Sequence, residues 1–410
     1  MLTNTLSPKE IIQKTILLLL ALFATMADYA QETSRYDMNK PFGWAVCSSL
    51  TKVDANVTGG KGGKKIVLQS DGYDMRDKLI EAINNYDIIV LDGEGGEFVV
   101  SSVMRFKDLA NKTIVGINYA RITTKFKLTA DLHKILDDKH VLDMPSSSDG
   151  KVHKLSNGNH VKEVREWAVR QAIIDTTGDQ QEQFREAGLF HFNNISNVII
   201  RNLTLRGPGA VDVGGSDLMT LSGGSKNVWV DHCEFIDGMD GNFDINSFSD
   251  FITISWCKFR YTSNTYDHAN TNLVGSNDKA EMNGIDNLNI TYAFCNWDEG
   301  CNQRMPMARF GTIHLLNNLY TCDNCSLAVN PRKDSEVRLE GCVFTYGVQN
   351  VFKADDAKAY QFKDNIIESD FKLPPSLGTV SIPYAYNSIP VLKVKAEVGK
   401  FVGATLTNPL

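Results

Sequence analysis

The chain contains the stretch Asn227-Val-Trp-Val-Asp-His-Cys-Glu-Phe235, and its pattern recurs four more times. In each copy the second position is Val or Ile, the fourth is apolar, the seventh is Cys or Asn and the ninth is aromatic. The later copies span residues 251–259, 289–297, 312–320 and 336–344, and looser copies begin at 197 and 359. Successive starts are 30, 24, 38, 23, 24 and 23 residues apart, a spacing typical of a solenoid.

The repeated stretches have the composition of strands rather than helices. Their apolar positions alternate and are rich in β-branched and aromatic residues, without a helical period. Polar loops of variable length separate them, and the longer intervals indicate loop excursions. We therefore predict an all-β fold, a parallel β-helix, in which the Cys and aromatic positions stack from coil to coil inside the protein.

The composition is that of an ordered globular protein. The chain has 410 residues, of which 42% are hydrophobic. Because a solenoid grows by stacking, we assign residues 31–410 to a single elongated catalytic domain. The formal net charge of −7 argues against nucleic acid as a partner. It leaves a polyanionic substrate open, because a local basic cleft or a bound cation can reverse the field.

Residues 1–30 have the features of a secretory signal peptide. Lys9 and Lys14 precede an apolar run, and small residues follow at Ala27 and Ala30. The run is too short to span a bilayer, so we expect no membrane span once it is removed. A retained N-terminal anchor is the alternative. We expect the protein to be secreted, periplasmic or held at the cell surface.

Three segments are expected outside the regular coils. Residues 74–84 have helical apolar spacing and precede an apolar strand at 87–91, which predicts an N-terminal capping helix. Residues 145–192 interrupt the repeat and include a helical pattern at 161–173. After residue 367 the repeat fades, and several prolines indicate a tail packed along the outside.

Eight cysteines in an exported chain permit disulfides. Four occupy the seventh repeat position, where we expect small buried residues: Cys233, Cys257, Cys295 and Cys342. Cys322 and Cys325 form a Cys-x-x-Cys pair, which favours a local disulfide. A four-cysteine zinc site is not expected, because the chain has no second such pair.

Three aspartates are candidates for a metal site. Asp240 and Asp244 are four residues apart at the start of a predicted strand, and Asp217 lies one coil earlier. Stacked coils bring equivalent positions about 5 Å apart, so the three carboxylates would raise one another's pKa unless a cation intervened. Oxygen ligands in an irregular site suit Ca²⁺. The alternative is that these aspartates form turns and point into solvent.

Three arginines are candidates for binding an acidic substrate. Arg304 and Arg309 precede the copy at 312–320, and Arg332 precedes the next copy, so all three can project from adjacent coils. Arginine matches a carboxylate with two parallel hydrogen bonds, as recognition of an acidic sugar requires. Surface salt bridges are the alternative.

Asp231 and His232 place an acid next to an imidazole, a combination found in general bases. They occupy the fifth and sixth positions of the repeat, where neighbours in the strand or turn hold side chains in place. We therefore interpret them as a structural hydrogen-bonded pair.

Four motifs occur in an order that resembles the pectate lyases of polysaccharide lyase family 1. They are Val228-Trp-Val-Asp-His232, Asp240-Gly-Asn-Phe-Asp-Ile245, Asn272-Leu-Val-Gly-Ser276 and Arg304-Met-Pro-Met-Ala-Arg-Phe-Gly311. The resemblance covers essentially the whole chain after the predicted signal peptide and implies a right-handed parallel β-helix. It also implies calcium-dependent cleavage of α-1,4-polygalacturonate, the backbone of pectin, by β-elimination to unsaturated oligogalacturonides.

The resemblance implies a role for each candidate residue. Arg304 would be the base, and Ca²⁺ would be held by Asp217, Asp240 and Asp244. Substrate would be bound by Arg309, Arg332 and Asn270. Because a free guanidinium is protonated at neutral pH, an arginine base predicts an alkaline activity optimum.

Two positions depart from the family pattern. Asn270 stands where the family usually has a lysine, and an amide can donate a hydrogen bond but cannot neutralise a carboxylate. Gly215-Ser216-Asp217 stands where many members have Asp-x-Asp. Asp212 is a candidate for the missing carboxylate. Both departures predict an affinity for substrate or calcium that differs from the family norm.

Three other functions are consistent with parts of the sequence. A pectin lyase has the same fold and acts on methyl-esterified chains without calcium, but the three aspartates favour the pectate enzyme. A β-helical polygalacturonase would use paired carboxylates to activate water, which leaves the arginines without a role. The third is a non-catalytic carbohydrate-binding β-helix. We expect a monomer.

Overall fold

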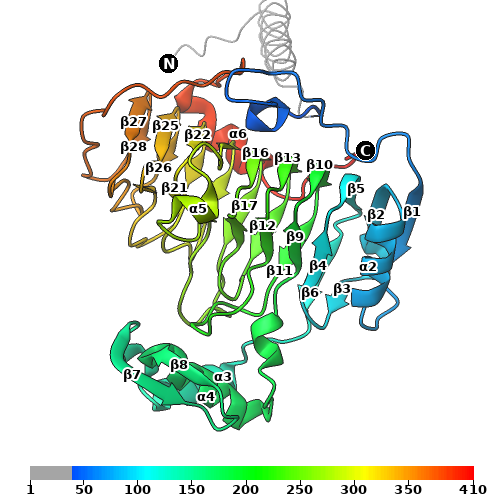
Figure 1. Cartoon of the computed structure of the whole chain (residues 1–410), viewed down its shortest axis with the longest axis vertical. Coiled ribbons are helices and arrows are strands. Elements are labelled where there is room, and N and C mark those ends of the chain that lie inside the picture. Colours follow the sequence, from blue (N-terminus) through cyan, green and yellow to red (C-terminus); the bar gives the residue numbers. More distant parts are fainter. Residues whose placement is uncertain (1–38) are drawn as a thin grey trace, which may run out of the picture. The chain divides into compact units, whose positions relative to one another are not determined.

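The structure, a computed structural model, describes residues 39–410, and the predicted signal peptide lies outside them. Residues Pro41–Leu410 form one compact unit. Within the described residues, parallel strands form three sheets of ten, nine and seven strands (Figure 1). The chain passes from one sheet to the next, and each coil pairs with the coil before it. The fold is a right-handed parallel β-helix, which confirms the prediction.

The strands are short and belong to the sheets in a regular order. The ten-stranded sheet contains β1 (Lys65–Gln69), β2 (Ile88–Asp92), β5 (Ala110–Ile117), β10 (Ser196–Arg201), β13 (Lys226–Asp231), β16 (Asp250–Ser255), β19 (Ile290–Ala293), β22 (Thr312–Leu316), β25 (Glu336–Glu340) and β27 (Ala359–Lys363). The nine-stranded sheet contains β3 (Phe98–Val100), β6 (Arg121–Thr124), β11 (Thr204–Arg206), β14 (Glu234–Ile236), β17 (Lys258–Arg260), β20 (Asn296–Trp297), β23 (Leu319–Tyr320), β26 (Val343–Phe344) and β28 (Ile366–Ile367). The seven-stranded sheet contains β4 (Met104–Lys107), β9 (Phe190–Asn193), β12 (Met219–Ser222), β15 (Phe243–Ile245), β18 (Leu273–Val274), β21 (Met307–Arg309) and β24 (Asn330–Arg332).

The repeat places a bend between the ten-stranded and nine-stranded sheets at its sixth position. The backbone there is left-handed in every copy, with φ of 47° at His232, 51° at Trp256, 57° at Phe294, 50° at Asn317 and 62° at Gly341. Bulky residues rarely adopt this conformation. Here the rings stack, since the centroid of Trp256 lies 5.7 Å from that of His232 and 4.6 Å from that of Phe294. The stacking offsets part of the cost of the bend.

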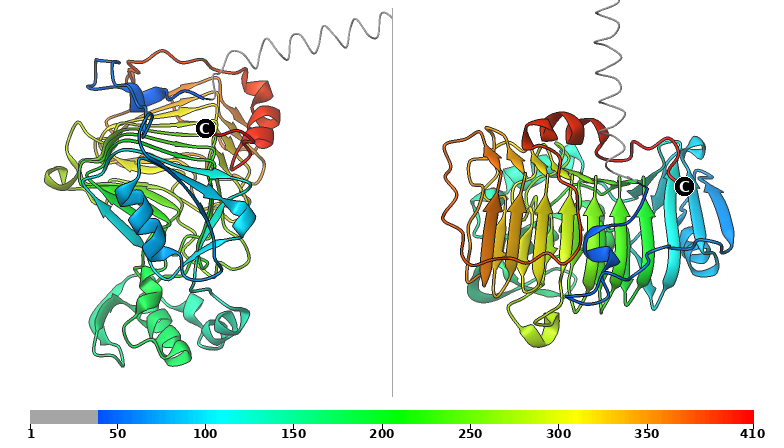
Figure 2. Two further views of the ribbon diagram at one scale, coloured as in Figure 1. Left: turned by 90° about the vertical axis from the view of Figure 1, so that its right-hand side faces the viewer. Right: turned by 90° about the horizontal axis from the view of Figure 1, so that it is seen from above.

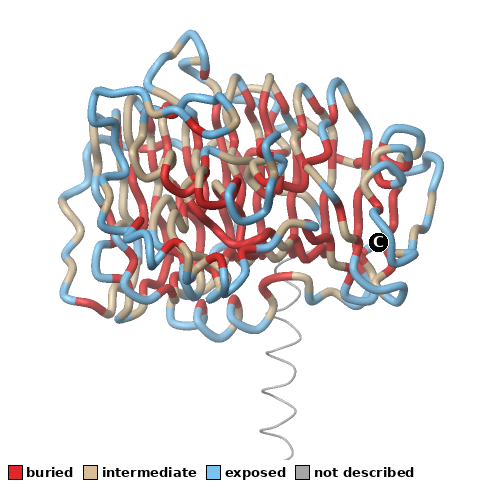
Figure 3. Tube along the Cα trace, turned by 90° about the horizontal axis from the view of Figure 1, so that it is seen from below, coloured by how far each residue is buried: buried red, intermediate tan, exposed pale blue. Residues whose placement is uncertain are grey.

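The ninth position of the repeat forms an aromatic ladder inside the coil. Successive ring centroids are 5.1, 5.5, 4.6 and 4.2 Å apart along Phe235, Phe259, Trp297, Tyr320 and Phe344. The four repeat cysteines are also fully buried, as predicted. Figure 3 shows buried residues recurring along successive coils. All eight cysteines are free thiols, so the local disulfide expected between Cys322 and Cys325 is not formed.

The predicted capping helix is present as α2 (Arg76–Asn85), but it does not precede the first strand. Its buried residues Leu79, Ala82 and Ile83 join the main core at the N-terminal end of the solenoid. The strand β1 comes before it and pairs with β2 at the edge of the sheet. We did not predict β1 from the sequence, because its apolar run is only three residues long and is flanked by the polar residues Lys65 and Gln69.

The excursion from the coils begins earlier than predicted, directly after β6, and returns at β9. It contains α3 (Ala130–Asp138), α4 (Val164–Thr177) and a hairpin of β7 (Ser148–Lys154) and β8 (His160–Glu163) (Figure 1). Its core includes Val211, Val213 and Met239, which belong to the loops that lead into the seven-stranded sheet. The excursion therefore packs against the same loops that carry candidate site residues.

Two terminal segments cover the outer face of the ten-stranded sheet (Figure 2). On the N-terminal side the backbone N–H of Trp44 donates to Thr291 Oγ1 at 3.0 Å. In the C-terminal tail the Tyr384 hydroxyl lies 2.6 Å from the same oxygen. The tail continues through α6 (Val394–Phe401), which confirms the predicted packing along the outside. No helix in the described part of the chain is both long enough and apolar enough to cross a membrane.

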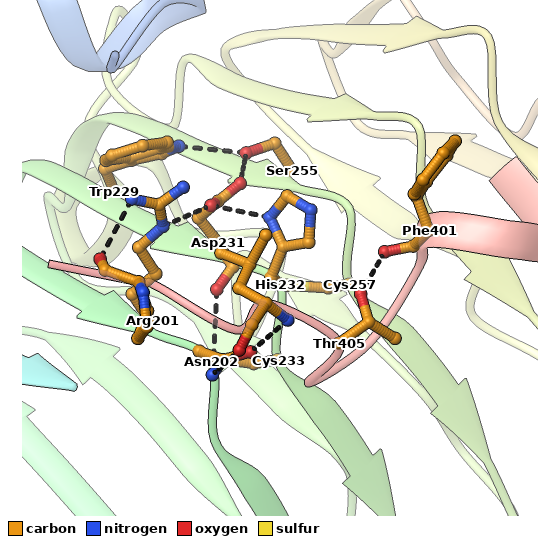
Figure 4. Close-up of polar contacts among 12 residues, drawn as sticks. Arg201, Asn202, Trp229, Asp231, His232, Cys233, Ser255, Cys257, Phe401 and Thr405 are labelled. Carbon is orange, nitrogen blue, oxygen red and sulfur yellow. Dashed lines mark hydrogen bonds and ion pairs between the residues drawn. The ribbon is translucent and has the colours of Figure 1, made fainter. Parts of the chain in front are cut away.

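Asp231 and His232 form the expected structural pair (Figure 4). Asp231 lies 2.7 Å from His232 Nδ1 and accepts hydrogen bonds from Arg201 Nε at 2.8 Å and from Ser255 Oγ at 2.6 Å. Arg201 also donates to the carbonyl oxygen of Pro409 in the tail. Both members of the pair are fully buried and do not face solvent, and Arg201 links Asp231 to the tail.

Candidate active site

The seven-stranded sheet carries several predicted site residues on its outer face. Strand residues alternate between core and surface, so that Phe243 and Ile245 are buried while Asp244 between them is partly exposed. The register also aligns residues across strands, and Arg309 lies directly beside Arg332. The remaining candidates come from loops that join the nine-stranded to the seven-stranded sheet: Asp217, Asp240, Asn270 and Arg304.

Two of the predicted metal ligands converge at Gly241. A Cβ on this glycine would lie 2.7 Å from Asp217 Oδ1 and 3.2 Å from Asp244 Oδ1, so a side chain here would crowd both oxygens. Asp217 accepts a hydrogen bond from Thr220 Oγ1 at 2.9 Å, and Asp244 accepts one from the Leu273 N–H at 3.0 Å. Thr220 is the residue opposite Asp244 in the register. We had expected Asp217 at the position equivalent to Asp244 one coil earlier, but Thr220 occupies that position. Asp217 reaches the site from the preceding loop instead.

The surroundings of these carboxylates favour their protonated forms. Burial raises the pKa of Asp244 to about 7, although the Leu273 N–H and the charge of Arg304 oppose the rise. Burial and the charges of Asp244 and Asp240 raise the pKa of Asp217 well above its usual range. Neutralising both carboxylates would require either protons or a cation.

Asp240 has a different partner, His268. Its Oδ1 lies 3.0 Å from His268 Nε2, and Asp212 Oδ1 lies 3.9 Å from the Nδ1 of the same ring. Burial disfavours the charged imidazole, but the hydrogen bond and charge of Asp240, followed by the charge of Asp212, outweigh it and raise the pKa of His268. Sequence reasoning assigned no role to His268. Its only signal was its place two residues before the altered position Asn270.

The carboxylates of Asp217, Asp240 and Asp244 are chemically suited to a calcium ion, but only two of the three converge. Within residues 39–410, no group of three or more His, Cys, Asp or Glu side chains is arranged to hold a metal ion. Asp217 and Asp244 converge, whereas Asp240 is bonded to His268. Burial raises the pKa of both converging carboxylates, and a divalent cation that prefers oxygen ligands would neutralise them.

Arg304 lies beside this pair and is not committed to another group. It begins the Arg-x-Pro-x-x-Arg motif in a left-handed conformation, with φ of 62°. Its carbonyl oxygen accepts a hydrogen bond from the Asn272 N–H at 2.7 Å, and the next N–H, that of Leu273, donates to Asp244, so Arg304 borders the pair. Its charge opposes the rise in the pKa of both carboxylates. Its Nε is buried, and no described residue accepts a hydrogen bond from it. The unpaired donor marks a position where a ligand can bind.

Arg309 and Arg332 differ in how far they are already paired. Arg309 Nε donates to Asp278 Oδ1 at 2.6 Å, and its Nη1 donates to the Gly275 carbonyl oxygen at 2.9 Å. Arg332 forms no ion pair with any described residue, and its Nη1 lies 4.0 Å from Met307 Sδ. Arg332 is thus free to bind an anion. An anion that binds Arg309 would first have to displace Asp278, whose side chain is 57% exposed.

Asn270 lies inside the wall of the site, only 2% exposed. Gln303 Nε2 donates to its Oδ1 at 2.6 Å, and its Nδ2 lies 2.8 Å from His268 Nε2. The amide oxygen thus has a protein donor, and the amide nitrogen packs against the His268 nitrogen that also faces Asp240, so contact with a substrate would require these neighbours to move. The motif that suggested a substrate-binding role gave no sign of this burial.

Comparison with known proteins places these residues in a family. Residues 158–392 match the sequence family described as Pectate lyase. The pectate trisaccharide-lyase of Thermotoga maritima is 27% identical over 306 residues, which cover 74% of this chain and 63% of that protein. The probable pectate lyase B of Aspergillus terreus is 36% identical over 189 residues, which cover 43% of this chain and 54% of that protein. The chain thus spans somewhat more than half the length of these relatives.

Solved structures share the fold at low sequence identity. A pectate lyase from Bacillus sp. N165, in complex with trigalacturonate, has a TM-score of 0.60 and 19% identity, covering 90% of this chain and 100% of that one. Pectate lyase C from Erwinia chrysanthemi, determined with Ca²⁺, has a TM-score of 0.52 and 15% identity, covering 88% and 98%. The matched family segment includes every candidate residue of the site. The chain belongs to the pectate lyase family.

Proposed function

We propose that the protein is a calcium-dependent pectate lyase that cleaves α-1,4-polygalacturonate by β-elimination and releases unsaturated oligogalacturonides. The observation that carries this proposal is the position of Arg304, whose buried Nε has no partner among the described residues, next to the two converging carboxylates Asp217 and Asp244. Membership of the family supports it, as do related structures determined with trigalacturonate and with Ca²⁺.

In this proposal the neutral form of Arg304, which is populated at alkaline pH, removes the C5 proton of a galacturonate unit. The C4–O bond to the neighbouring unit breaks as the C4–C5 double bond forms, and the leaving oxygen takes a proton from solvent. Arg332 binds a substrate carboxylate directly, and Arg309 does so after exchanging Asp278 for it. Asp278 can move into solvent because its side chain is 57% exposed, whereas Arg309, at 11%, stays in the wall of the site. The two guanidinium groups neighbour each other across strands β21 and β24, so they would fix the orientation of the uronate chain over the sheet.

Asp217 and Asp244 would hold the calcium ion, and Asp240 would join them by leaving His268. Bound there, Ca²⁺ would stabilise the negative charge that develops on the uronate carboxylate as the proton leaves. Asp217 and Asp244 would also be kept ionised, as a metal ligand must be. Asn270 would act on substrate only through a rearrangement of its bonds to Gln303 and His268.

The test is an assay on polygalacturonate with added calcium or with a chelator. Eliminative cleavage makes an unsaturated product, so we expect ultraviolet absorbance to rise only with calcium. Arg304→Lys should abolish turnover and leave calcium binding intact, while Arg76→Lys, at a partly exposed position on α2 far along the chain from the site, should retain full activity. An active Arg304→Lys variant would show that another group removes the proton.

The same assay separates the competing functions. Absorbance that rises on methyl-esterified pectin in the presence of chelator would indicate a pectin lyase. New reducing ends without absorbance would indicate hydrolysis, and binding without any product would indicate a carbohydrate-binding protein. The three aspartates favour the calcium-dependent enzyme among these.

We also propose that the protein is exported and acts as a monomer. The N-terminal apolar run with its preceding lysines supports export. Fractionation of expressing cells, with and without residues 1–30, tests the first point, and size-exclusion chromatography with light scattering tests the second. Retention of the full-length chain in the cytoplasm, or a dimer at assay concentrations, would contradict them.

A further inference from the structure

The outer face of the seven-stranded sheet continues well beyond the proposed calcium site. The register places Thr220 beside Asp244, His191 beside Thr220, and Arg105 beside His191. These residues form one outward row from β15 through β12 and β9 to β4. Since neighbouring strands are about 4.8 Å apart, Arg105 lies about 14 Å from Asp244 along the sheet.

A pocket of about 160 Å³ opens at the β4 end of this row. It is lined by Arg105, Phe106, Lys107, His191 and Asn193. The pocket thus presents two cationic side chains, an imidazole and an amide, whereas the side chain of Phe106 belongs to the core beneath it. The cations suit the carboxylate of an acidic sugar, and the imidazole and the amide suit its hydroxyl groups.

The charges of the pocket are only partly compensated. Arg105 Nη1 lies 2.6 Å from Glu186 Oε2, with side chains 54% and 43% exposed. Lys107 Nζ, with its side chain 74% exposed, is 4.0 Å from Asp108 Oδ2. Exposed pairs of this kind contribute about 0–1 kcal/mol. A substrate carboxylate can therefore replace Glu186 on the guanidinium at little cost.

The polar residues of the pocket are held in place by Ser222. His191 Nε2 lies 3.0 Å from Ser222 Oγ, and Asn193 Nδ2 donates to the same oxygen at 3.1 Å. Burial, reinforced by the charge of Arg105, lowers the pKa of His191, which favours a neutral ring with hydrogen-bonding capacity. The side of the pocket that would face hydroxyl groups is thus ordered before a ligand binds.

We propose that this pocket is a further binding subsite for a galacturonate carboxylate, with Arg105 and Lys107 as its anion-binding residues. The inference rests on the proposed function, because it assumes that a polyuronate chain lies across the sheet. Arg105 and Lys107 lie three strands from Asp244, and so they would increase affinity for long chains without taking part in the cleavage.

Binding and turnover, measured separately, test the proposal. The double variant Arg105→Gln/Lys107→Gln should bind hexagalacturonate about fivefold to tenfold more weakly in calorimetry with chelator present. With calcium present, its KM for polygalacturonate should rise by a similar factor at unchanged kcat. The matched control is Arg76→Gln/Lys78→Gln, which removes two paired cations from α2. It should bind and turn over as the unchanged protein does.

A second variant separates the subsite from a merely structural ion pair. Glu186→Gln frees Arg105 and should leave hexagalacturonate binding unchanged or tighter. The subsite would be overturned by weaker binding in Glu186→Gln or by unchanged binding in the Arg105/Lys107 variant. It would also be overturned if the α2 control bound as weakly as the Arg105/Lys107 variant. Absence of turnover with binding intact would overturn the proposed lyase activity alone, whereas absence of binding by the unchanged protein would overturn the subsite.

Discussion

Gly241 passes between two carboxylates, and its replacement by alanine tests whether they act together on a cation. The added Cβ would lie 2.7 Å from Asp217 Oδ1 and 3.2 Å from Asp244 Oδ1, whereas ordinary contacts begin at 3.4 Å. At least one carboxylate must therefore move by several tenths of an ångström. Displacements of about 0.5 Å are enough to spoil a designed metal site.

The expected result is a loss of calcium affinity with retention of the fold. Changes that reorient metal ligands typically reduce affinity about 10- to 100-fold, equivalent to about 1.4–2.8 kcal/mol. Calorimetric titration of Gly241→Ala with Ca²⁺ measures the affinity directly, and the calcium concentration giving half-maximal cleavage should rise by the same factor. Circular dichroism checks that the coils are intact.

Gly399→Ala provides the matched control. This glycine lies in α6 with no other atom within 4 Å of an added Cβ. We expect unchanged calcium affinity and a stability gain of up to about 1 kcal/mol, because alanine is the better helix former. Wild-type calcium affinity in Gly241→Ala would refute the reasoning, since the two carboxylates would then not share a cation.

Three further predictions concern residues that hold the coils together. Asp231→Asn should cost about 1.5–3 kcal/mol in urea unfolding, because the buried, charged carboxylate accepts hydrogen bonds from Arg201 and Ser255, while kcat of the folded fraction stays unchanged; a loss below about 0.5 kcal/mol would contradict this role. Phe259→Leu should cost about 1–3 kcal/mol through two lost ring stacks, and an unchanged melting temperature would argue against the ladder. Burial lowers the pKa of His314 to about 3, below its ordinary value of 6.5, so the unfolded chain binds the extra proton. The contribution of the neutral His314 to the free energy of unfolding is complete above pH 6.5 and is lost as the pH falls from 6.5 toward 3. In His314→Gln the free energy of unfolding should therefore depend less on pH in this range. The same pH dependence in the variant would exclude His314 as its cause.

The sequence determined the coils of this protein because their pattern is local. Apolar residues at alternate positions and an aromatic at the ninth predict buried strands whatever the rest of the chain does. Identical positions in successive copies then stack by register, so the ladder from Phe235 to Phe344 followed directly. The strand β1 escaped prediction because it lies at the sheet edge, where only alternate residues are partly buried.

The candidate site was predictable in its membership but not in its arrangement. The motifs contained Asp244 and Arg304, and Asp217 was a candidate because it lies one coil earlier. In the structure Asp217 and Asp244 converge, and Arg304 lies next to them. The same motifs could not show that His268 engages Asp240, or that Asn270 is buried. Both contacts depend on how irregular loops fold against one another.

The positions of strand residues could be predicted from the sequence and those of loop residues could not, for a physical reason. A strand position is set by hydrogen bonding to the coil before it, so short-range sequence determines which side chains face inward. A loop side chain is placed by long-range contacts, as when the excursion after β6 packs its core against Val211, Val213 and Met239. The sequence alone therefore specified a β-helix with a set of acidic and basic candidates. Only the tertiary structure decided which of them converge at Gly241, and which are already paired.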